Sequence, residues 1–172
     1  EKPWLKKTRQ FYAGQYTEAF SRKEMPQQHL DQFNIKIDEY VKHHDSHAAA
    51  GYFTSPFKEE GATILTVDAI GEWETVSIST ANKAHMERKE TINYPHSVGI
   101  LYSAFTHRCG GLSDWHPEAD VMDIAASIQQ VTEETLADLF LRASKYGSKN
   151  LVYAGGVALN CAANTVLANL GL

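Results

Sequence analysis

The sequence predicts an α/β fold in which a mixed sheet is flanked by helices. Short apolar runs rich in β-branched and aromatic residues occur at 62–67 and 150–154, as expected of buried strands. Apolar residues recur at helical spacing over 98–105 and 119–146, which indicates amphipathic helices. Strand and helix patterns that alternate along one chain are typical of the α/β class.

The first elements surround a cluster of three histidines. Residues 37–41 predict a short strand, and a helix is expected directly after it, with Asp45 or Ser46 as its cap. This helix is expected to end near Thr54, because Pro56 disfavours helical conformation in the residue before it.

The later elements follow from periodicity and from turn residues. Residues 76–80 alternate Val or Ile with Ser, which predicts a strand with one solvent-facing side, and 85–92 predict a more polar strand. Ser97 is placed to cap the first amphipathic helix. A last helix is expected over 157–170, so the predicted order is β-α-β-β-β-α-α-β-α.

Composition narrows the class of protein. The 172 residues are 43% hydrophobic and 22% charged, with a net charge of −5, which is ordinary for a globular domain and does not favour a nucleic-acid surface. No apolar run approaches the length of about 18 residues needed to span a membrane. Cys109 and Cys161 lie far apart, which favours free thiols in the reducing cytoplasm.

His43 and His47 are candidate metal ligands. Residues four apart share one helix face, so both imidazoles can point at one ion. Asp68 follows a buried strand and completes a set of two histidines and one carboxylate, which suits Fe(II), with Zn(II) as the alternative. Position 44 is His rather than Glu, so this is not the zincin motif. The competing interpretation is that the histidines are ordinary surface or core residues and that Asp68 caps a turn.

Two glycine-containing turns are candidate ligand-binding segments. Gly71 lies in a D-x-x-G-x-x-x-T run whose simplest interpretation is a β-hairpin, although such a turn can also bind phosphate through backbone N–H groups. Gly155 and Gly156 separate a strand from a helix, which lets a ligand approach the backbone closely. Asn160 follows and can donate or accept hydrogen bonds. A tight turn without a ligand remains the alternative.

Several longer motifs, taken together, resemble one family. They are HHxSHAA at 43–49, TSPF at 54–57, LTVDxxGEW at 65–73, PHSVGxLYSAFT at 95–106, DIAASIQ at 123–129 and GGVALN at 155–160. In identity and order they resemble the O-carbamoyltransferases of the nodulation and antibiotic-tailoring type.

The resemblance implies a fold and a reaction. The main domain of that family is similar to the tRNA threonylcarbamoyl-adenosine synthase subunit, which has the actin/Hsp70/sugar-kinase fold of two ribonuclease-H-like lobes around a nucleotide cleft. Its members make carbamoyl-adenylate from carbamoyl phosphate and ATP. They then pass the carbamoyl group to a hydroxyl of a small sugar-like or antibiotic-like acceptor. Neither a nucleic-acid nor a membrane partner is expected.

The resemblance also implies roles for individual residues. The positions that match the iron ligands are His43, His47 and Asp68. Those that match the adenine-nucleotide loop are Gly155, Gly156 and Asn160, and those that match a loop near the phosphates are Gly71 and Glu72. His44 is assigned as a catalytic base only because it lies beside the ligands, and the alternative is that it supports the ligands from behind without touching the substrate.

The chain also departs from the family pattern. Ala69 stands where the family usually has Gly. The family's N-terminal strand and phosphate hairpin, the insert before the helix at 123, the last metal-ligand Asp and the YrdC-like domain have no counterpart in 1–172. We therefore expect a partial domain that is inactive alone. An ATP-binding kinase-like module or a non-catalytic module of the same fold are the alternatives. Acceptor identity stays open, and so does homo-oligomerisation.

Overall fold

The computed structural model describes residues 30–110 and 118–171, and the chain divides into two compact units, Glu1–Lys42 and His43–Leu172. In the first unit a helical turn at 30–31 is followed by residues 35–42 without regular secondary structure. The predicted strand at 37–41 is therefore wrong. A short run of β-branched and aromatic residues forms a strand only when a neighbouring strand pairs with it, which the run itself does not specify.

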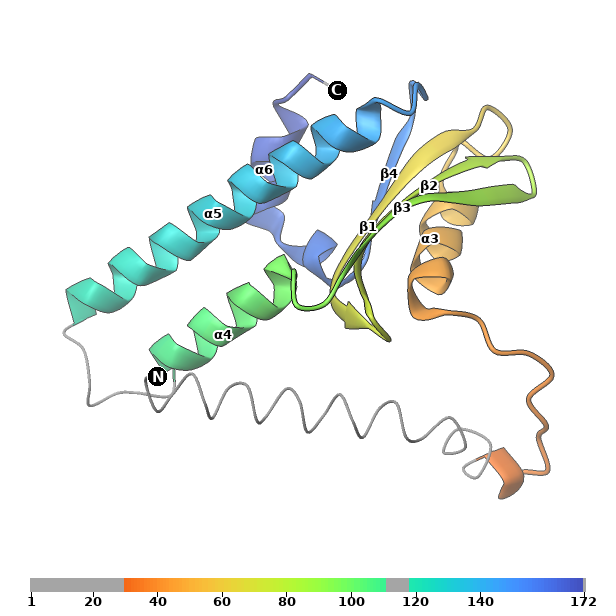
Figure 1. Ribbon diagram of the computed structural model, residues 1–172, viewed down its shortest axis with the longest axis horizontal. Helices are drawn as coiled ribbons and strands as arrows, with labels where there is room; N and C mark the ends of the chain where they lie inside the picture. Colours follow the sequence, from red (N-terminus) through yellow and green to blue (C-terminus); the bar gives the residue numbers. More distant parts are fainter. Residues whose placement is uncertain (1–29, 111–117, 172) are drawn as a thin grey trace. The chain divides into compact units, whose positions relative to one another are not determined.

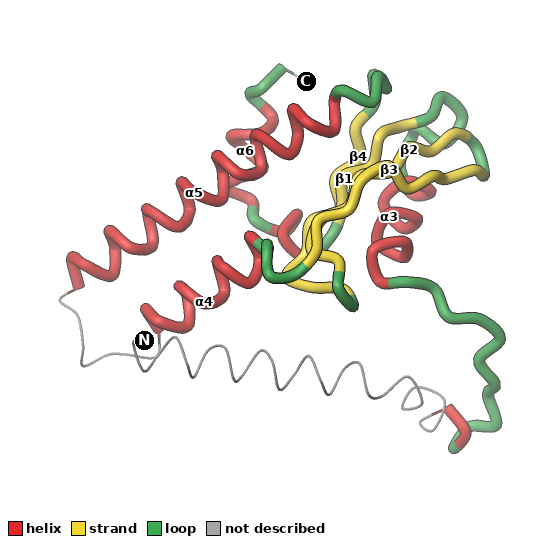
Figure 2. The backbone as a smooth tube through the Cα atoms, viewed as in Figure 1, coloured by secondary structure: helices red, strands yellow, loops and turns green. Residues whose placement is uncertain are grey.

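The second unit contains one mixed four-stranded sheet. Its strands are β1 (Ala62–Gly71), β2 (Glu74–Asn82), β3 (His85–Asn93) and β4 (Leu151–Ala154). Their order in the sheet is β3-β2-β1-β4. The β1–β2 and β2–β3 pairs are antiparallel, and β4 is parallel to β1. The predicted α/β architecture with a mixed sheet is confirmed (Figure 2).

Helices cover both faces of this sheet. Helix α3 (His43–Thr54) lies on one face, and α4 (Val98–Gly110), α5 (Glu118–Ser144) and α6 (Cys161–Ala168) lie on the other (Figure 1). The predicted single helix at 157–170 is wrong, because the 3-10 turn η1 (Gly156–Leu159) precedes α6. Asn160 separates the two with a non-helical backbone, and its side chain caps α6. None of the helices in the described ranges is both long and apolar enough to cross a bilayer.

Side chains of β1 alternate between two apolar cores. Leu65 and Val67 pack against the layer of α4, α5 and α6, whereas Ile64 packs against α3. The first core contains Leu65, Val67, Val76, Ile78, Val98, Leu136, Leu139, Ala143, Ala163 and Leu167. The second contains Ala48, Tyr52, Ala62, Ile64, Ala81 and Val152. Strand β1 is therefore buried on both faces, as its continuous apolar sequence predicts.

Strand β2 corrects a second expectation. The polar face of its Val/Ser alternation was expected to meet solvent, yet Ser77 and Ser79 are only 1% and 2% exposed. Val76 and Ile78 point into the first core, so the serines face α3, which covers them. The alternation of apolar and polar residues shows that the two faces of a strand differ in polarity, but it does not show which face is exposed to solvent.

Strand β1 loses regular pairing at its carboxyl end. Its parallel pairing with β4 ends at Thr66, and its register with β2 shifts between Val67 and Gly71. Asp68 lies in this irregular segment. Such bulges re-aim side chains and are common beside functional sites.

Glu90 on β3 links the sheet to the end of α5. Its carboxylate accepts a hydrogen bond from the Tyr146 hydroxyl at 2.6 Å and forms an ion pair with Arg142. The hydrogen bond from Tyr146, followed by the contact with Arg142, lowers the pKa of Glu90 below its usual value.

We predict that this link weakens in acid. A lowered folded-state pKa means that the contribution is complete above the unfolded-state pKa of about 4.3 and is lost as pH falls through the folded-state value. The Glu90→Gln variant is expected to lose about 1 kcal/mol of unfolding free energy at pH 7. The difference from the parent should vanish at low pH, as measured by urea unfolding between pH 7 and 3. A constant difference across that range contradicts the prediction.

Candidate functional site

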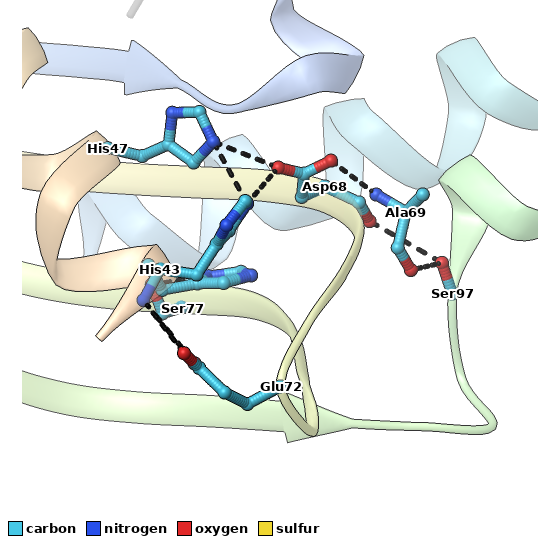
Figure 3. A network of polar contacts seen from close by, with 8 residues as sticks. His43, His47, Asp68, Ala69, Glu72, Ser77 and Ser97 are labelled. Carbon is cyan, nitrogen blue, oxygen red and sulfur yellow. Dashed lines mark hydrogen bonds and ion pairs between the residues drawn. The ribbon is translucent and has the colours of Figure 1, made fainter. Parts of the chain in front are cut away.

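Two histidines from α3 and one carboxylate from β1 converge on a common point (Figure 3). The Nε2 atom of His43 lies 2.8 Å from Oδ2 of Asp68, and the Nε2 atom of His47 lies 3.0 Å from the same oxygen. The two Nε2 atoms are 3.1 Å apart. The helical i, i+4 spacing aligns the rings, and the irregular end of β1 turns the carboxylate toward them.

The donor set fits a metal ion. Three atoms that each carry a lone pair and lie this close repel one another unless protons or a cation stand between them. With metal–ligand bonds of about 2.1 Å, neighbouring ligands are about 3.0 Å apart in octahedral geometry and about 3.4 Å apart in tetrahedral geometry. The three observed separations are also those of hydrogen bonds, so they are compatible with one bound ion, and Fe(II) stays a prediction.

The carboxylate of Asp68 is held in its ionised form. Burial of this side chain, which is 15% exposed, opposes ionisation. The hydrogen bond with His43, the bond from the Ala69 N–H to Oδ1 and the charges of both histidines outweigh that effect, so the pKa of Asp68 lies below its usual value. The group is therefore an anionic ligand at neutral pH.

Gly71 and Glu72 lie against the first turn of α3. Both carboxylate oxygens of Glu72 accept a hydrogen bond from the backbone N–H of His43 at 3.3 Å, which places a negative charge at the helix N-terminus. A Cβ atom on Gly71 would overlap the His43 ring. In the structure both residues support a predicted metal ligand, and the role near phosphates inferred from the resemblance stays a prediction.

His44 lies in the interior between α3 and the sheet. Its side chain is fully buried, and Nδ1 lies 3.1 Å from the Ser77 hydroxyl. Burial, opposed by the charge of Glu74, lowers the pKa of His44 to about 4. This placement argues against the base role expected from proximity, because a base must come within hydrogen-bond reach of its substrate.

A cleft of about 610 Å³ opens on the other side of Asp68. The described residues that line it come from β1, α4, α5, η1 and α6. They are Asp68, Ala69, Gly99, Tyr102, Ser103, Thr132, Gly156, Val157, Leu159, Asn160 and Cys161. Two of the three residues of the predicted nucleotide loop, Gly156 and Asn160, therefore lie at this cleft. Asp68 belongs to both the metal-ligand set and the cleft wall.

Three glycines let two segments, the first turn of α4 and the bend before η1, approach the end of β1. Gly155 has a φ of +100°, and a Cβ atom there would overlap the Val67 carbonyl. A Cβ on Gly156 would lie 2.8 Å from Oδ1 of Asp68, and one on Gly99 would lie 2.7 Å from the Ala69 Cα. The diglycine bend is therefore required for close packing against Asp68, whether or not a ligand is bound.

Sequence reasoning missed three polar residues near the site. Ser97 was expected only as a helix cap, but its hydroxyl also donates to the Ala69 carbonyl at 2.6 Å while it accepts from the Ile100 N–H. Tyr102 and Gln129 bond to each other at 3.2 Å beside the cleft. Both occur in the motifs at 95–106 and 123–129, which were the available signal, but no spacing rule distinguishes them from core residues.

Comparison with known proteins gives one family. The sequence profile of the carbamoyltransferase N-terminus family matches residues 14–115 and 113–172. An uncharacterized protein of Synechocystis sp. is 32% identical over 192 residues, which cover 73% of this chain and 31% of that protein.

Two further relatives have named activities. A tRNA N6-adenosine threonylcarbamoyltransferase of Limosilactobacillus reuteri is 37% identical over 92 residues, covering 53% of this chain and 26% of the relative. One of Lactobacillus johnsonii is 38% identical over 72 residues, covering 41% and 21%. The chain spans less than a third of the length of these curated relatives.

We predict that Gly71→Ala weakens metal binding. The added methyl group displaces the His43 ring, and loss of support around a ligand typically costs about 10- to 100-fold in affinity. Titration calorimetry with Fe(II) or Zn(II) under anaerobic conditions measures the effect. Gly147→Ala is the matched control, because its φ is +79° and nothing lies within 4 Å of an added Cβ. It should cost stability without changing metal affinity, and unchanged affinity in Gly71→Ala would refute the role assigned to Gly71.

Proposed function

The chain belongs to the carbamoyltransferase N-terminus family, and on that premise we propose that it forms the metal- and nucleotide-binding part of an O-carbamoyltransferase. The enzyme would transfer a carbamoyl group, through carbamoyl-adenylate made from carbamoyl phosphate and ATP, to a hydroxyl of a small-molecule acceptor. The observation that carries this proposal is the position of Asp68, whose Oδ2 faces His43 and His47 while the residue lines the adjacent cleft.

His43, His47 and Asp68 would hold the metal, with Fe(II) as the first candidate and Zn(II) as the alternative. When bound, such an ion supplies a Lewis acid that can polarise a carbonyl or phosphoryl oxygen. The three protein ligands occupy one side of the site. His43 and His47 remain 43% and 36% exposed, so the other side is open to a ligand.

The cleft supplies contacts for the nucleotide. Gly156 brings backbone to its surface, Val157 and Leu159 provide apolar surface, and Tyr102 and Asn160 provide polar groups. Among the described lining residues Asp68 is the only one charged at neutral pH, so the cleft wall has no side-chain cation for phosphates. We infer that the metal beside Asp68 and the N-terminus of α6 balance that charge.

The fold supports the placement of this domain in the actin/Hsp70/sugar-kinase class. An antiparallel β1-β2-β3 meander, extended by a β4 strand parallel to β1, is compatible with a ribonuclease-H-like lobe. In open α/β sheets, ligands bind beyond the carboxyl ends of the parallel strands. Asp68 lies in β1 just beyond its last pairing with β4, and the Gly155–Gly156 bend follows the end of β4.

Two features bear on the competing functions. The His/Asp ligand set counts against a kinase-like module, because phosphotransfer by that class does not need a metal held by two histidines. Two relatives act on tRNA by name. The chain carries a net charge of −5, and phosphate-backbone recognition relies on clustered Lys and Arg. We therefore propose a small hydroxyl acceptor rather than tRNA.

We predict stoichiometric iron in protein purified anaerobically. His43→Ala and His47→Ala should each lose most of it, because removal of one of three protein ligands leaves a weak site. His85→Ala is the control, since this histidine lies exposed on β3, outside the ligand set. Elemental analysis and the melting temperature are measured on all four proteins.

The outcomes separate the competing functions. Iron that is lost only in the two ligand variants supports the transferase. Metal-free protein that binds ADP supports the kinase-like module, and protein that binds neither supports a non-catalytic module.

We predict that ADP protects Cys161 from alkylation. Cys161 is exposed and lines the cleft, whereas Cys109 lies on α4 and is not among the residues lining it. Saturating ADP should slow modification of Cys161 several-fold and leave Cys109 unchanged, as followed by mass spectrometry of the two tryptic peptides. Equal rates with and without ADP would place the nucleotide elsewhere.

A further inference from the structure

One side-chain network ties together the three helices around the cleft. Asn160, in front of α6, donates from Nδ2 to Oε1 of Gln129 on α5 at 3.0 Å, and the Tyr102 hydroxyl on α4 donates to the same oxygen at 3.2 Å. Nε2 of Gln129 donates to Glu133 at 2.7 Å and approaches Oδ1 of Asn160 at 3.3 Å. Gln129 thus contacts two polar residues of the cleft wall, Tyr102 and Asn160, yet is not itself among the lining residues.

The donor and the acceptor of each hydrogen bond in this network are fixed by two end groups, one that can only donate and one that can only accept. The backbone N–H of Ala163 can only donate, so the atom of Asn160 that lies 3.1 Å from it is the oxygen. The amide nitrogen of Asn160 then faces Gln129, which must present its oxygen there. The nitrogen of Gln129 in turn faces the Glu133 carboxylate, which can only accept.

This arrangement leaves a defined pattern at the cleft. One hydrogen of the Asn160 Nδ2 takes no part in these bonds, and the Tyr102 hydroxyl, whose hydrogen points at Gln129, keeps its oxygen as an acceptor. Asn160 and Tyr102 therefore have one N–H donor and one oxygen acceptor left for a ligand, on a wall that also carries Asp68, Ser103 and Thr132. A ligand group that pairs with it must itself present an acceptor beside a donor, as the N1 and amino group of adenine do.

We propose that Gln129 is a positioning residue that holds Asn160 and Tyr102 in this donor–acceptor arrangement for the base of a bound adenine nucleotide. The inference rests on the proposed function of the cleft. Gln129 acts through its two partners, because a glutamine that bridges them removes their rotational freedom before the ligand binds.

The test uses ADP and five proteins. Gln129→Leu should weaken ADP binding about tenfold in titration calorimetry. Gln129→Glu should also weaken it, because a second carboxylate then faces Glu133. The exchange Gln129→Glu with Glu133→Gln restores a donor and an acceptor in swapped positions, and should bring affinity back to within about threefold of the parent.

The chain offers a matched control on the same helix. Gln130 donates to Glu134 at 2.9 Å, the same i, i+4 pair on an exposed part of α5, so Gln130→Leu should leave ADP binding unchanged. If Gln129→Leu binds ADP like the parent, or if the exchange variant is no better than Gln129→Glu, the inference is overturned. The same holds if Gln130→Leu weakens binding as much as Gln129→Leu.

A readout without ligand keeps this inference distinct from the proposed function. The side-chain amide signals of Asn160 in ¹⁵N-correlated NMR spectra should exchange slowly with solvent in the parent and the exchange variant, and fast in Gln129→Leu. A parent protein that fails to bind ADP removes the nucleotide function but leaves these signals to decide the positioning role. Identical Asn160 exchange in the parent and Gln129→Leu rejects that role, even where Gln129→Leu is too unstable for calorimetry.

Discussion

The close approach of three segments to the carboxyl end of β1 is the constraint on which the site depends. Glycine is required at each approach, because a Cβ on Gly71 would overlap His43 and one on Gly99, Gly155 or Gly156 would press on residues 67–69. Regular pairing of β1 ends at the same place. The irregular strand end turns the Asp68 carboxylate toward the histidines, and the glycines let the first turn of α3, the first turn of α4 and the bend before η1 pack closely around it.

Helix α3 is fixed to the sheet by polar contacts as well as by its apolar core. His44 lies 3.1 Å from the buried Ser77 hydroxyl, and Arg88 on β3 forms ion pairs with Asp45 on α3 and with Glu74 on β2. Glu72 accepts from the first N–H of the helix. These bonds set the rotation of α3, and the rotation decides whether two imidazoles four residues apart face Asp68. Forming buried polar contacts costs desolvation free energy, but these contacts favour one orientation of α3 on the sheet over others.

Asp68 connects two environments with different chemistry. On the side of α3 it meets two imidazoles, which form a compact donor set for a cation. On the side of α4 and η1 it borders a cleft whose other described lining residues are uncharged. A cation bound by the two imidazoles and Asp68 would add positive charge next to the cleft. Metal binding at the histidines and anion binding in the cleft are therefore expected to strengthen each other. Such coupling would give one physical reason for the two proposed sites to share a single domain.

The sequence by itself determined the element types, the buried central strand, the candidate ligands His43, His47 and Asp68, and the diglycine bend. Each of these follows from local rules of periodicity, spacing and turn chemistry. It did not determine that residues 37–41 form no strand, which face of β2 is buried, or that the helix is interrupted at Asn160. These depend on which partner covers a segment.

The roles of His44, Glu72 and Gln129 were decided only by the tertiary structure. The rotation of α3 about its axis gives His44 a different role from His43 and His47. It buries the His44 ring against the sheet and leaves the rings of His43 and His47 partly exposed. Glu72 and Gln129 find their partners 29 and 31 residues away. Contacts at such separations leave no periodic signal in the sequence, because the packing of helices on the sheet creates them.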